Sequence, residues 1–163
     1  MKNRRAFIVG LKSTLLSDKE KFFLKKFKPW GVILFSRNIK SIDQISLLTG
    51  SIKKIFKDKN YPILIDEEGG KVSRLSKLIT TNNFSAELFG KLYQNNFKKF
   101  KIYYDLYINQ TSNLLKKIGI NINTVPLLDI RRKNSNKIIG DRSFGSDPKK
   151  VSAIGNYCIN RFT

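Results

Sequence analysis

Short apolar runs alternate along the chain with stretches in which apolar residues recur at helical spacing. The helical spacing is clearest at Ile45, Leu48, Ile52 and Ile55. Strands that alternate with helices pair in parallel and are joined by right-handed crossovers, so the pattern predicts an α/β fold. The apolar runs that we interpret as its strands are residues 6–11, 31–36, 61–66 and 120–125.

Capping residues mark where the first two helices begin. Ser17 with Glu20, and Ser41 with Gln44, have the spacing of a capping box, in which each residue of the pair satisfies a backbone N–H of the other. Pro29 should stop the first helix, because its ring cannot continue a helical ladder.

One long helix is expected in the second half of the chain, followed by a last helix. Gly119 should end the long helix, and Asp147 with Pro148 suit the cap and first position of the last one, which should run to about Phe162. A stripe of large apolar side chains at helical spacing is typical of a surface that faces a core. The residues expected to carry this stripe are Phe97, Phe100, Tyr104, Ile108, Leu115 and Ile118.

Polar side chains follow the predicted strands where each strand ends. The clearest case is residues 63–75, I-L-I-D-E-E-G-G-K-V-S-R-L, where an apolar run leads into three carboxylates, two glycines and two cations. The carboxyl ends of parallel strands meet at one edge, where α/β folds bind ligands, so these clusters should form one rim. Gly69 and Gly70 permit a sharp turn there, because glycine adopts left-handed torsions without a Cβ penalty. The alternative is a solvated surface with weak ion pairs. The other clusters are residues 36–38, Asp129 and residues 141–142.

Length and charge bound the class of protein. The chain has 163 residues, 40% of them hydrophobic, which is enough for one modest domain with a core. Its 32 Lys and Arg residues against 12 acids give a formal charge of +20, which raises the possibility of a nucleic-acid-binding module. The lysines are scattered over polar helix faces, however, and no zinc-finger spacing or RNA-binding aromatic strand accompanies them. A solvated surface is therefore the favoured interpretation, and no specific nucleic-acid partner is expected.

The absent residue types exclude several kinds of site. The chain has no histidine and one cysteine, Cys158, so it cannot assemble a Ser-His-Asp triad, a His-ligated zinc site or an internal disulfide. No metal or cofactor is expected. The alternation of strands and helices fits a (β/α)8 barrel or an open doubly wound sheet. No glycine-rich phosphate fingerprint follows the first predicted strand, which disfavours the nucleotide-binding version of such a sheet. The N-terminal apolar run of six residues is too short to span a membrane, so a cytoplasmic protein without a membrane partner is expected.

Four stretches together resemble one family. They are G-V-I-L-F-S-R-N-I at 31–39, I-D-E-E-G-G-K-V-S-R-L at 65–75, V-P-L-L-D-I at 125–130 and I-G-D-R-S-F at 139–144. In order and spacing they are similar to the N-terminal half of bacterial β-N-acetylhexosaminidases, which are family-three glycoside hydrolases. The resemblance implies the N-terminal half of a (β/α)8 TIM barrel, with residues 1–163 a truncated catalytic domain of about four β/α units. It also implies removal of terminal β-linked N-acetylglucosamine from peptidoglycan-derived glycans.

The resemblance assigns three residues to a sugar-binding rim. Asp66 resembles the carboxylate that accepts hydrogen bonds from sugar hydroxyls, and Arg74 and Arg142 resemble the sugar-site arginines of the family. Either arginine has an alternative role as a salt-bridge anchor for its loop. The chain departs from the family pattern at Glu67, where the family usually has a neutral amide, and at Lys71, where it usually has arginine.

Catalysis by this chain alone is not expected. The family is implied to use a retaining mechanism, with an aspartate nucleophile and a histidine acid/base that both come later than residue 163. A pair formed by Asp66 with Asp129 or Asp141 is disfavoured, because those positions match sugar-binding and loop-building roles. Association with a complementary C-terminal half, or self-association, is expected. The alternative functions are a catalytically inactive carbohydrate-binding remnant, which would lose sugar affinity in Asp66→Ala, and the basic nucleic-acid-binding module.

Overall fold

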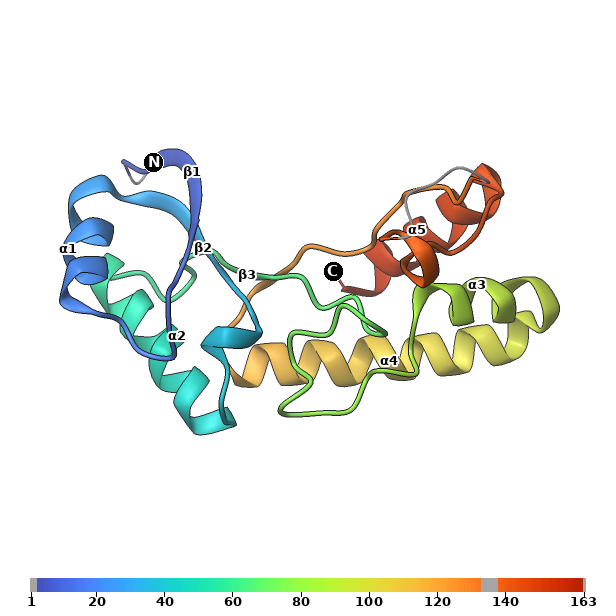
Figure 1. Cartoon of the computed structure of the whole chain (residues 1–163), viewed down its shortest axis with the longest axis horizontal. Helices are drawn as coiled ribbons and strands as arrows, with labels where there is room; N and C mark the ends of the chain where they lie inside the picture. The colour runs from blue at the N-terminus through green and yellow to red at the C-terminus, as the bar shows by residue number, and fades with distance from the viewer. Residues whose placement is uncertain (1–2, 133–137, 163) are drawn as a thin grey trace. The chain divides into compact units, whose positions relative to one another are not determined.

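The computed structural model describes residues 3–132 and 138–162 and divides the chain into two compact units (Figure 1). Unit 1 consists of Met1–Asp66, Arg74–Ile79 and Leu114–Thr124, and unit 2 of Glu67–Ser73, Thr80–Asn113 and Val125–Thr163. Each unit has its own hydrophobic cluster.

Unit 1 contains a parallel sheet with strand order β1-β2-β3-β4. The strands are β1 (Arg5–Gly10), β2 (Pro29–Leu34), β3 (Ile63–Ile65) and β4 (Ile122–Asn123). The four predicted strands and their parallel pairing are confirmed, although β3 and β4 are shorter than predicted.

The side chain of Asn121 explains why β4 begins late. Its Oδ1 accepts a hydrogen bond from the backbone N–H of Ile63 at 2.8 Å, and its amide donates to the carbonyl oxygen of Tyr61 at 3.0 Å. These side-chain bonds take the place of some of the backbone pairing at the start of β4, although the N–H of Asn121 still donates to the carbonyl of Ile63 at 3.2 Å. At the other end, the N–H of Thr124 still donates to the carbonyl of Ile65 at 2.9 Å.

The helices of unit 1 begin where the capping residues predict. Helix α1 (Asp18–Phe27) has the complete Ser17–Glu20 capping box and ends before Pro29, as expected. Helix α2 (Ile42–Phe56) is capped by the Ser41 hydroxyl, but its expected second capping box is only half formed. The reason is that the Gln44 side chain accepts from the N–H of Lys40 at 2.8 Å instead of turning back to Ser41.

The core of unit 1 lies between the sheet and these two helices, which lie beside the strands in Figure 1. Side chains from both kinds of element are completely buried, and each stabilises the fold by about 1.5–3 kcal/mol. A short helical turn, η1 (Ser36–Asn38), follows β2. The core includes Leu24, Val32, Leu34, Ile45, Ile52, Ile63, Ile65 and Ile118.

Unit 2 is helical. It contains α3 (Ala86–Asn95), most of α4 (Phe97–Lys117), the short turn η2 (Gly140–Arg142) and α5 (Pro148–Phe162), which starts at the predicted Asp147 cap. In Figure 1, α3 lies along α4, and α3 contacts both α5 and η2. No helix within residues 3–132 and 138–162 is long and apolar enough to cross a membrane.

The expected long helix is present as α4, and a separate helix that the sequence analysis did not predict, α3, precedes it, with Asn96 between the two. The backbone N–H of Asn96 closes α3 by donating to Leu92, while its Oδ1 accepts from the N–H of Lys99 at 3.0 Å and caps α4. One side chain thus ends one helix and starts the next. Phe97 is 51% exposed, so its predicted core position is wrong. The other five residues of the stripe are buried, as predicted.

Candidate functional site

Asp66 lies at the carboxyl end of the sheet in unit 1, directly after β3. The Thr124 hydroxyl, which follows β4, donates to its Oδ1, and Nη2 of Arg74 lies 3.6 Å from its Oδ2. The Asp66 and Arg74 side chains are 28% and 29% exposed, so both remain reachable from solvent. The structure therefore brings together two of the three predicted site residues as an ion pair held by a neighbouring strand.

The aromatic ring of Phe35 lies beside this pair and contacts two arginine side chains. The Arg74 guanidinium lies over the Phe35 ring, 5.6 Å from its centroid, and Arg37 lies over the same ring at 4.5 Å. The Arg37 Nε also donates to the carbonyl of Leu11 at 2.9 Å, and Asn38 donates to the same oxygen. The polar cluster after β2 thus supports the chain at the ends of β1 and β2.

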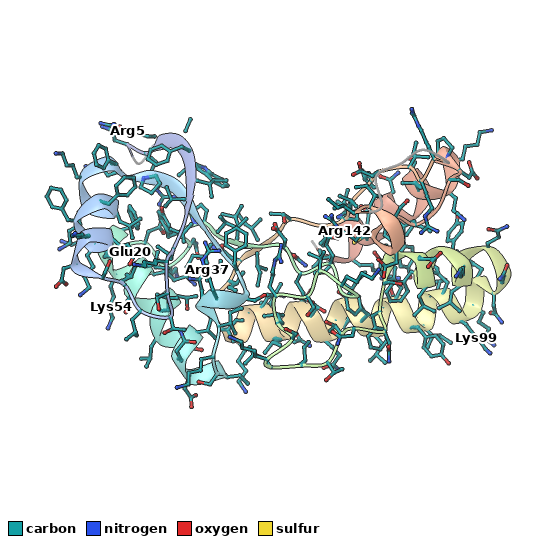
Figure 2. The ribbon with its side chains drawn as sticks, in the orientation of Figure 1. Arg5, Glu20, Arg37, Lys54, Lys99 and Arg142 are labelled. Carbon is teal, nitrogen blue, oxygen red and sulfur yellow. The ribbon has the colours of Figure 1, made fainter. Side chains whose placement is uncertain are left out.

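Arg142 lies in unit 2, in the orange segment that holds η2 (Figure 2). Its Nε and Nη2 donate to the two carboxylate oxygens of Glu68 at 2.8 and 2.7 Å, which is a bidentate pair. The two side chains are 21% and 15% exposed. This contact is what the loop-anchoring interpretation of Arg142 describes, and a sugar contact by Arg142 stays a prediction.

The neighbouring carboxylate, Glu67, is buried. It is 1% exposed and accepts a hydrogen bond from the Thr81 hydroxyl at 3.1 Å. The phenol of Tyr107 has a pKa above its ordinary value. Burial of the phenol is the larger cause, and the negative charge of the nearby Glu67 is the second. Two successive carboxylates therefore have different surroundings, with Glu68 paired to a cation and Glu67 placed in the interior.

The two glycines form the turn that the sequence predicts. Gly69 and Gly70 have φ angles of +77° and +57°. A Cβ added at Gly69 would lie 2.4 Å from the carbonyl oxygen of Phe84 and 2.8 Å from the Tyr107 hydroxyl. Gly69 is therefore required both by its torsion and by close packing.

Cys158 is not available as a nucleophile at neutral pH. Burial raises the pKa of its thiol to about 11, and its side chain is 1% exposed. Within the part of the chain that the structure describes, no group of three or more His, Cys, Asp or Glu residues could hold a metal ion.

The sequence interpretation missed Thr124 and the Glu68–Arg142 pair. Thr124 could have been found, because it is a polar residue near the carboxyl end of the predicted strand 120–125, as Asp66 is in the predicted strand 61–66. The partner of Glu68 lies 74 residues away along the chain and leaves no local signal.

The chain is similar to known proteins over almost its whole length. The model of the "Glycosyl hydrolase family 3 N terminal domain" matches residues 9–162. A β-hexosaminidase of Hydrogenovibrio crunogenus is 34% identical over 153 residues, which are 93% of this chain and 42% of that protein. A β-hexosaminidase of Alkalilimnicola ehrlichii is 34% identical over 146 residues, covering 88% of this chain and 40% of that protein.

Solved structures show the same fold. NagZ from Neisseria gonorrhoeae, crystallised with zinc ion, superimposes with a TM-score of 0.80 at 24% identity, covering 98% of this chain and 47% of that one. A family 3 β-N-acetylglucosaminidase from Paenibacillus superimposes with a TM-score of 0.78 at 27% identity, covering 96% and 29%. The predicted fold class, the N-terminal half of a TIM barrel with parallel strands alternating with helices, is confirmed.

The chain spans less than half the length of these relatives. Because the family model covers nearly every residue, and because the parallel sheet carries its polar residues at the expected edge, the chain belongs to glycosyl hydrolase family 3.

Proposed function

We propose that this chain is part of a glycoside hydrolase that removes terminal β-linked N-acetylglucosamine from peptidoglycan-derived glycans by a retaining mechanism. In this proposal Asp66, Arg74 and Arg142 belong to its sugar-binding rim. The acid/base histidine and the aspartate nucleophile come from outside these 163 residues, which contain no histidine.

The placement of Asp66 is the observation that carries the proposal. A carboxylate that is held by Thr124 and Arg74, yet is 28% exposed, presents acceptor oxygens to a pair of sugar hydroxyls without reorganising. The N. gonorrhoeae NagZ crystallised with N-trifluoroacetyl-D-glucosamine supports an N-acylated glucosamine as the ligand class. The peptidoglycan origin of the glycan rests on the family resemblance.

Titration of N-acetylglucosamine into the purified chain tests the role of Asp66. Asp66→Asn should weaken binding roughly 10- to 100-fold, because hydrogen bonds to a charged acceptor contribute about 1.5–3 kcal/mol. Asp43→Asn, at an exposed position of α2, is the matched control and should bind as the unaltered chain does. Equal affinity of all three proteins would remove Asp66 from the sugar site.

The purified chain should not hydrolyse a nitrophenyl N-acetylglucosaminide. Hydrolysis needs a nucleophile and an acid/base on opposite sides of the glycosidic bond, and the proposal places both elsewhere. Release of nitrophenol that tracks with the purified 163-residue protein would contradict it.

Adding the remaining C-terminal part of the H. crunogenus relative distinguishes a split or truncated enzyme from a carbohydrate-binding remnant. Restored hydrolysis supports a split or truncated enzyme, and sugar binding without hydrolysis supports the carbohydrate-binding remnant.

Two further expectations stay predictions. The net charge of +20 makes weak, salt-sensitive binding to nucleic acid expected, and only tight or sequence-selective binding near 0.15 M salt would favour a nucleic-acid-binding module. A cytoplasmic location is checked by fractionating the cells that make the protein.

A further inference from the structure

Arg131 joins helix α3 to the loop that carries Arg142, and both arginines and α3 lie in unit 2. Its Nη1 donates to the Glu87 carboxylate of α3 at 2.7 Å, and its Nη2 donates to the carbonyl oxygen of Gly140 at 2.7 Å. The same Nη2 donates to the carbonyl oxygen of Ser143 at 3.3 Å. These two carbonyls stand before and after Arg142 along the chain. One guanidinium therefore holds the backbone on both sides of the residue that the proposed function places in the sugar-binding rim.

The turn η2 has one strong and one weak backbone hydrogen bond of its own. The N–H of Arg142 donates to the carbonyl of Ile139 at 2.8 Å, but the N–H of Ser143 lies 3.5 Å from the carbonyl oxygen of Gly140. The second distance is longer than the usual range of about 2.7–3.2 Å. A carbonyl oxygen has two lone pairs, so Gly140 can also accept from Arg131, and a charged donor makes the shorter and stronger bond. The end of the turn thus depends on Arg131.

Further contacts fix where the chain after η2 lies. The backbone N–H of Arg131 donates to the carbonyl of Gly145 at 2.9 Å, and the buried Ser143 hydroxyl donates to the carbonyl of Asp129 at 2.7 Å. These bonds hold residues 143–145 beside residues 129–131. The guanidinium of Arg131 extends the same attachment back to Gly140, at the start of the turn.

The pair between Arg142 and Glu68 is sensitive to the placement of this backbone. Both of its bonds, at 2.8 and 2.7 Å, form only when the plane of the guanidinium faces the carboxylate. A shift of the turn would leave one bond or none.

We propose that Arg131 is a positioning residue for Arg142. By binding the carbonyls of Gly140 and Ser143, it fixes the backbone from which the Arg142 guanidinium faces Glu68. An arginine is required, because its rigid fork binds α3 and the loop at the same time, whereas the ammonium group of lysine is a single point of charge. The consequence for sugar binding rests on the proposed function, whereas the positioning of the Arg142–Glu68 pair does not.

Nitrogen-15 NMR of the purified chain tests the positioning without sugar. The Nε–H of Arg142 donates to Glu68, so its exchange with water requires the pair to open. Its signal is identified by its loss in Arg142→Gln. In Arg131→Lys this exchange should become roughly 10-fold faster, because the turn opens more often. Unchanged exchange in Arg131→Lys would overturn the proposal.

Arg161→Lys is the matched control for this measurement. Arg161 is on α5 in the same unit and forms an ion pair with Asp105 of α4 at 3.1 Å. Its replacement removes the same kind of pair, so it reports what a general loss of stability does to the Arg142 signal. The exchange of that signal should stay as in the unaltered chain. Equal acceleration in Arg161→Lys and Arg131→Lys would contradict a specific role of Arg131.

Glu87→Gln keeps the proposal testable if Arg131→Lys does not fold. This variant retains the arginine and loosens it from its other end, because an amide oxygen accepts a weaker hydrogen bond from a guanidinium than a carboxylate does. Exchange at Arg142 should become faster in the same direction, by a smaller factor than in Arg131→Lys. No change in Glu87→Gln would then overturn the proposal.

Titration of N-acetylglucosamine separates positioning from a purely structural role. Arg131→Lys should weaken sugar binding roughly 3- to 10-fold, and the double variant Arg131→Lys/Arg142→Gln should bind as Arg142→Gln does, because Arg131 acts only through Arg142. A purely structural role would lower the urea unfolding midpoint of Arg131→Lys and leave the sugar affinity of the folded protein unchanged. A double variant that binds more weakly than Arg142→Gln would also overturn the proposal.

Failure of the proposed function gives a different result. If Arg142→Gln binds sugar as the unaltered chain does, Arg142 is not part of the sugar-binding rim. The NMR exchange at Arg142 then still decides whether Arg131 positions the pair with Glu68.

Discussion

Adjacent acidic residues have separate tasks in this protein. Asp66 is held by Thr124 and Arg74 at the end of the sheet, Glu67 is buried, and Glu68 takes Arg142 as a bidentate partner. The difference arises because each carboxylate meets different donors, and not from any difference in chemical type.

Glu87 makes stability depend on pH. A hydrogen bond from Arg131, at 2.7 Å, lowers the pKa of Glu87, burial opposes this shift, and the charges of Arg131 and Lys91 add to the lowering. A carboxyl whose pKa is lower in the folded state than in the unfolded state stabilises the folded state. This stabilisation is fully present when the pH is above the pKa of the unfolded chain, near 4.5. This stabilisation is lost as the pH falls from there through the folded pKa.

The comparison of Glu87→Gln with the unaltered chain checks this dependence. Urea unfolding should show the variant to be less stable at pH 7, with the difference shrinking towards pH 3. Asp43→Asn, at an exposed carboxylate of α2, serves as the control and should change stability little at either pH. A difference for Glu87→Gln that is constant from pH 7 to pH 3 would contradict the prediction.

Helix α3 can pack closely against the chain after η2 because residue 90 is a glycine. A Cβ added at Gly90 would lie 1.8 Å from the carbonyl oxygen of Phe144, so this helix approaches the chain after η2 more closely than any other residue permits. Gly90→Ala should therefore destabilise the protein by about 1–3 kcal/mol, despite the better helix propensity of alanine.

Gly50 in α2 is the matched control for Gly90. Nothing lies within 4 Å of a Cβ added there, so Gly50→Ala should stabilise the protein by about 0.5–1 kcal/mol through helix propensity alone. Urea unfolding of both variants measures the two changes in stability, which should have opposite signs. The same sign for the two substitutions would show that close packing does not govern α3.

Both units leave large apolar side chains exposed. In unit 1 they include Ile8 on β1 at 45% and Leu47 on α2 at 68%, and in unit 2 Ile102 and Leu106 on α4 at 55% and 56%. Within the described residues, β1 and β4 are the end strands of the sheet, and parallel sheets are normally covered on both faces. These features favour association with a complementary half or with a second copy.

Light scattering should therefore give a mass above the 18.8 kDa of one chain. The mass should rise with salt, because a charge of +20 repels a second copy and salt screens that repulsion over about 10 Å at 0.1 M. Ile8→Lys on the end strand should reduce association more than Leu47→Lys on a helix. A monomer at low and high salt would argue against this expectation.

Many of the strands and helices could be predicted because their signals are local. The apolar runs, the Ser17 cap and the Asp147 cap depend on residues a few positions apart, and each is where the sequence places it. The Asn96 cap of α4 is also a local signal, which the sequence analysis did not use. Half of the second capping box failed for another reason, since Gln44 found partners outside its own helix.

The sequence by itself determined the α/β class, the alternation of strands and helices along the chain, the position of Asp66 at the end of a strand and the glycine turn that follows. These depend on side-chain periodicity and on torsions that only glycine tolerates, both of which are properties of short segments. The partners of the carboxylates were decided by the tertiary structure alone. Arg142 reaches Glu68 across 74 residues, and Tyr107 meets Gly69 across 38, because packing, which no local pattern encodes, sets which distant groups share one place.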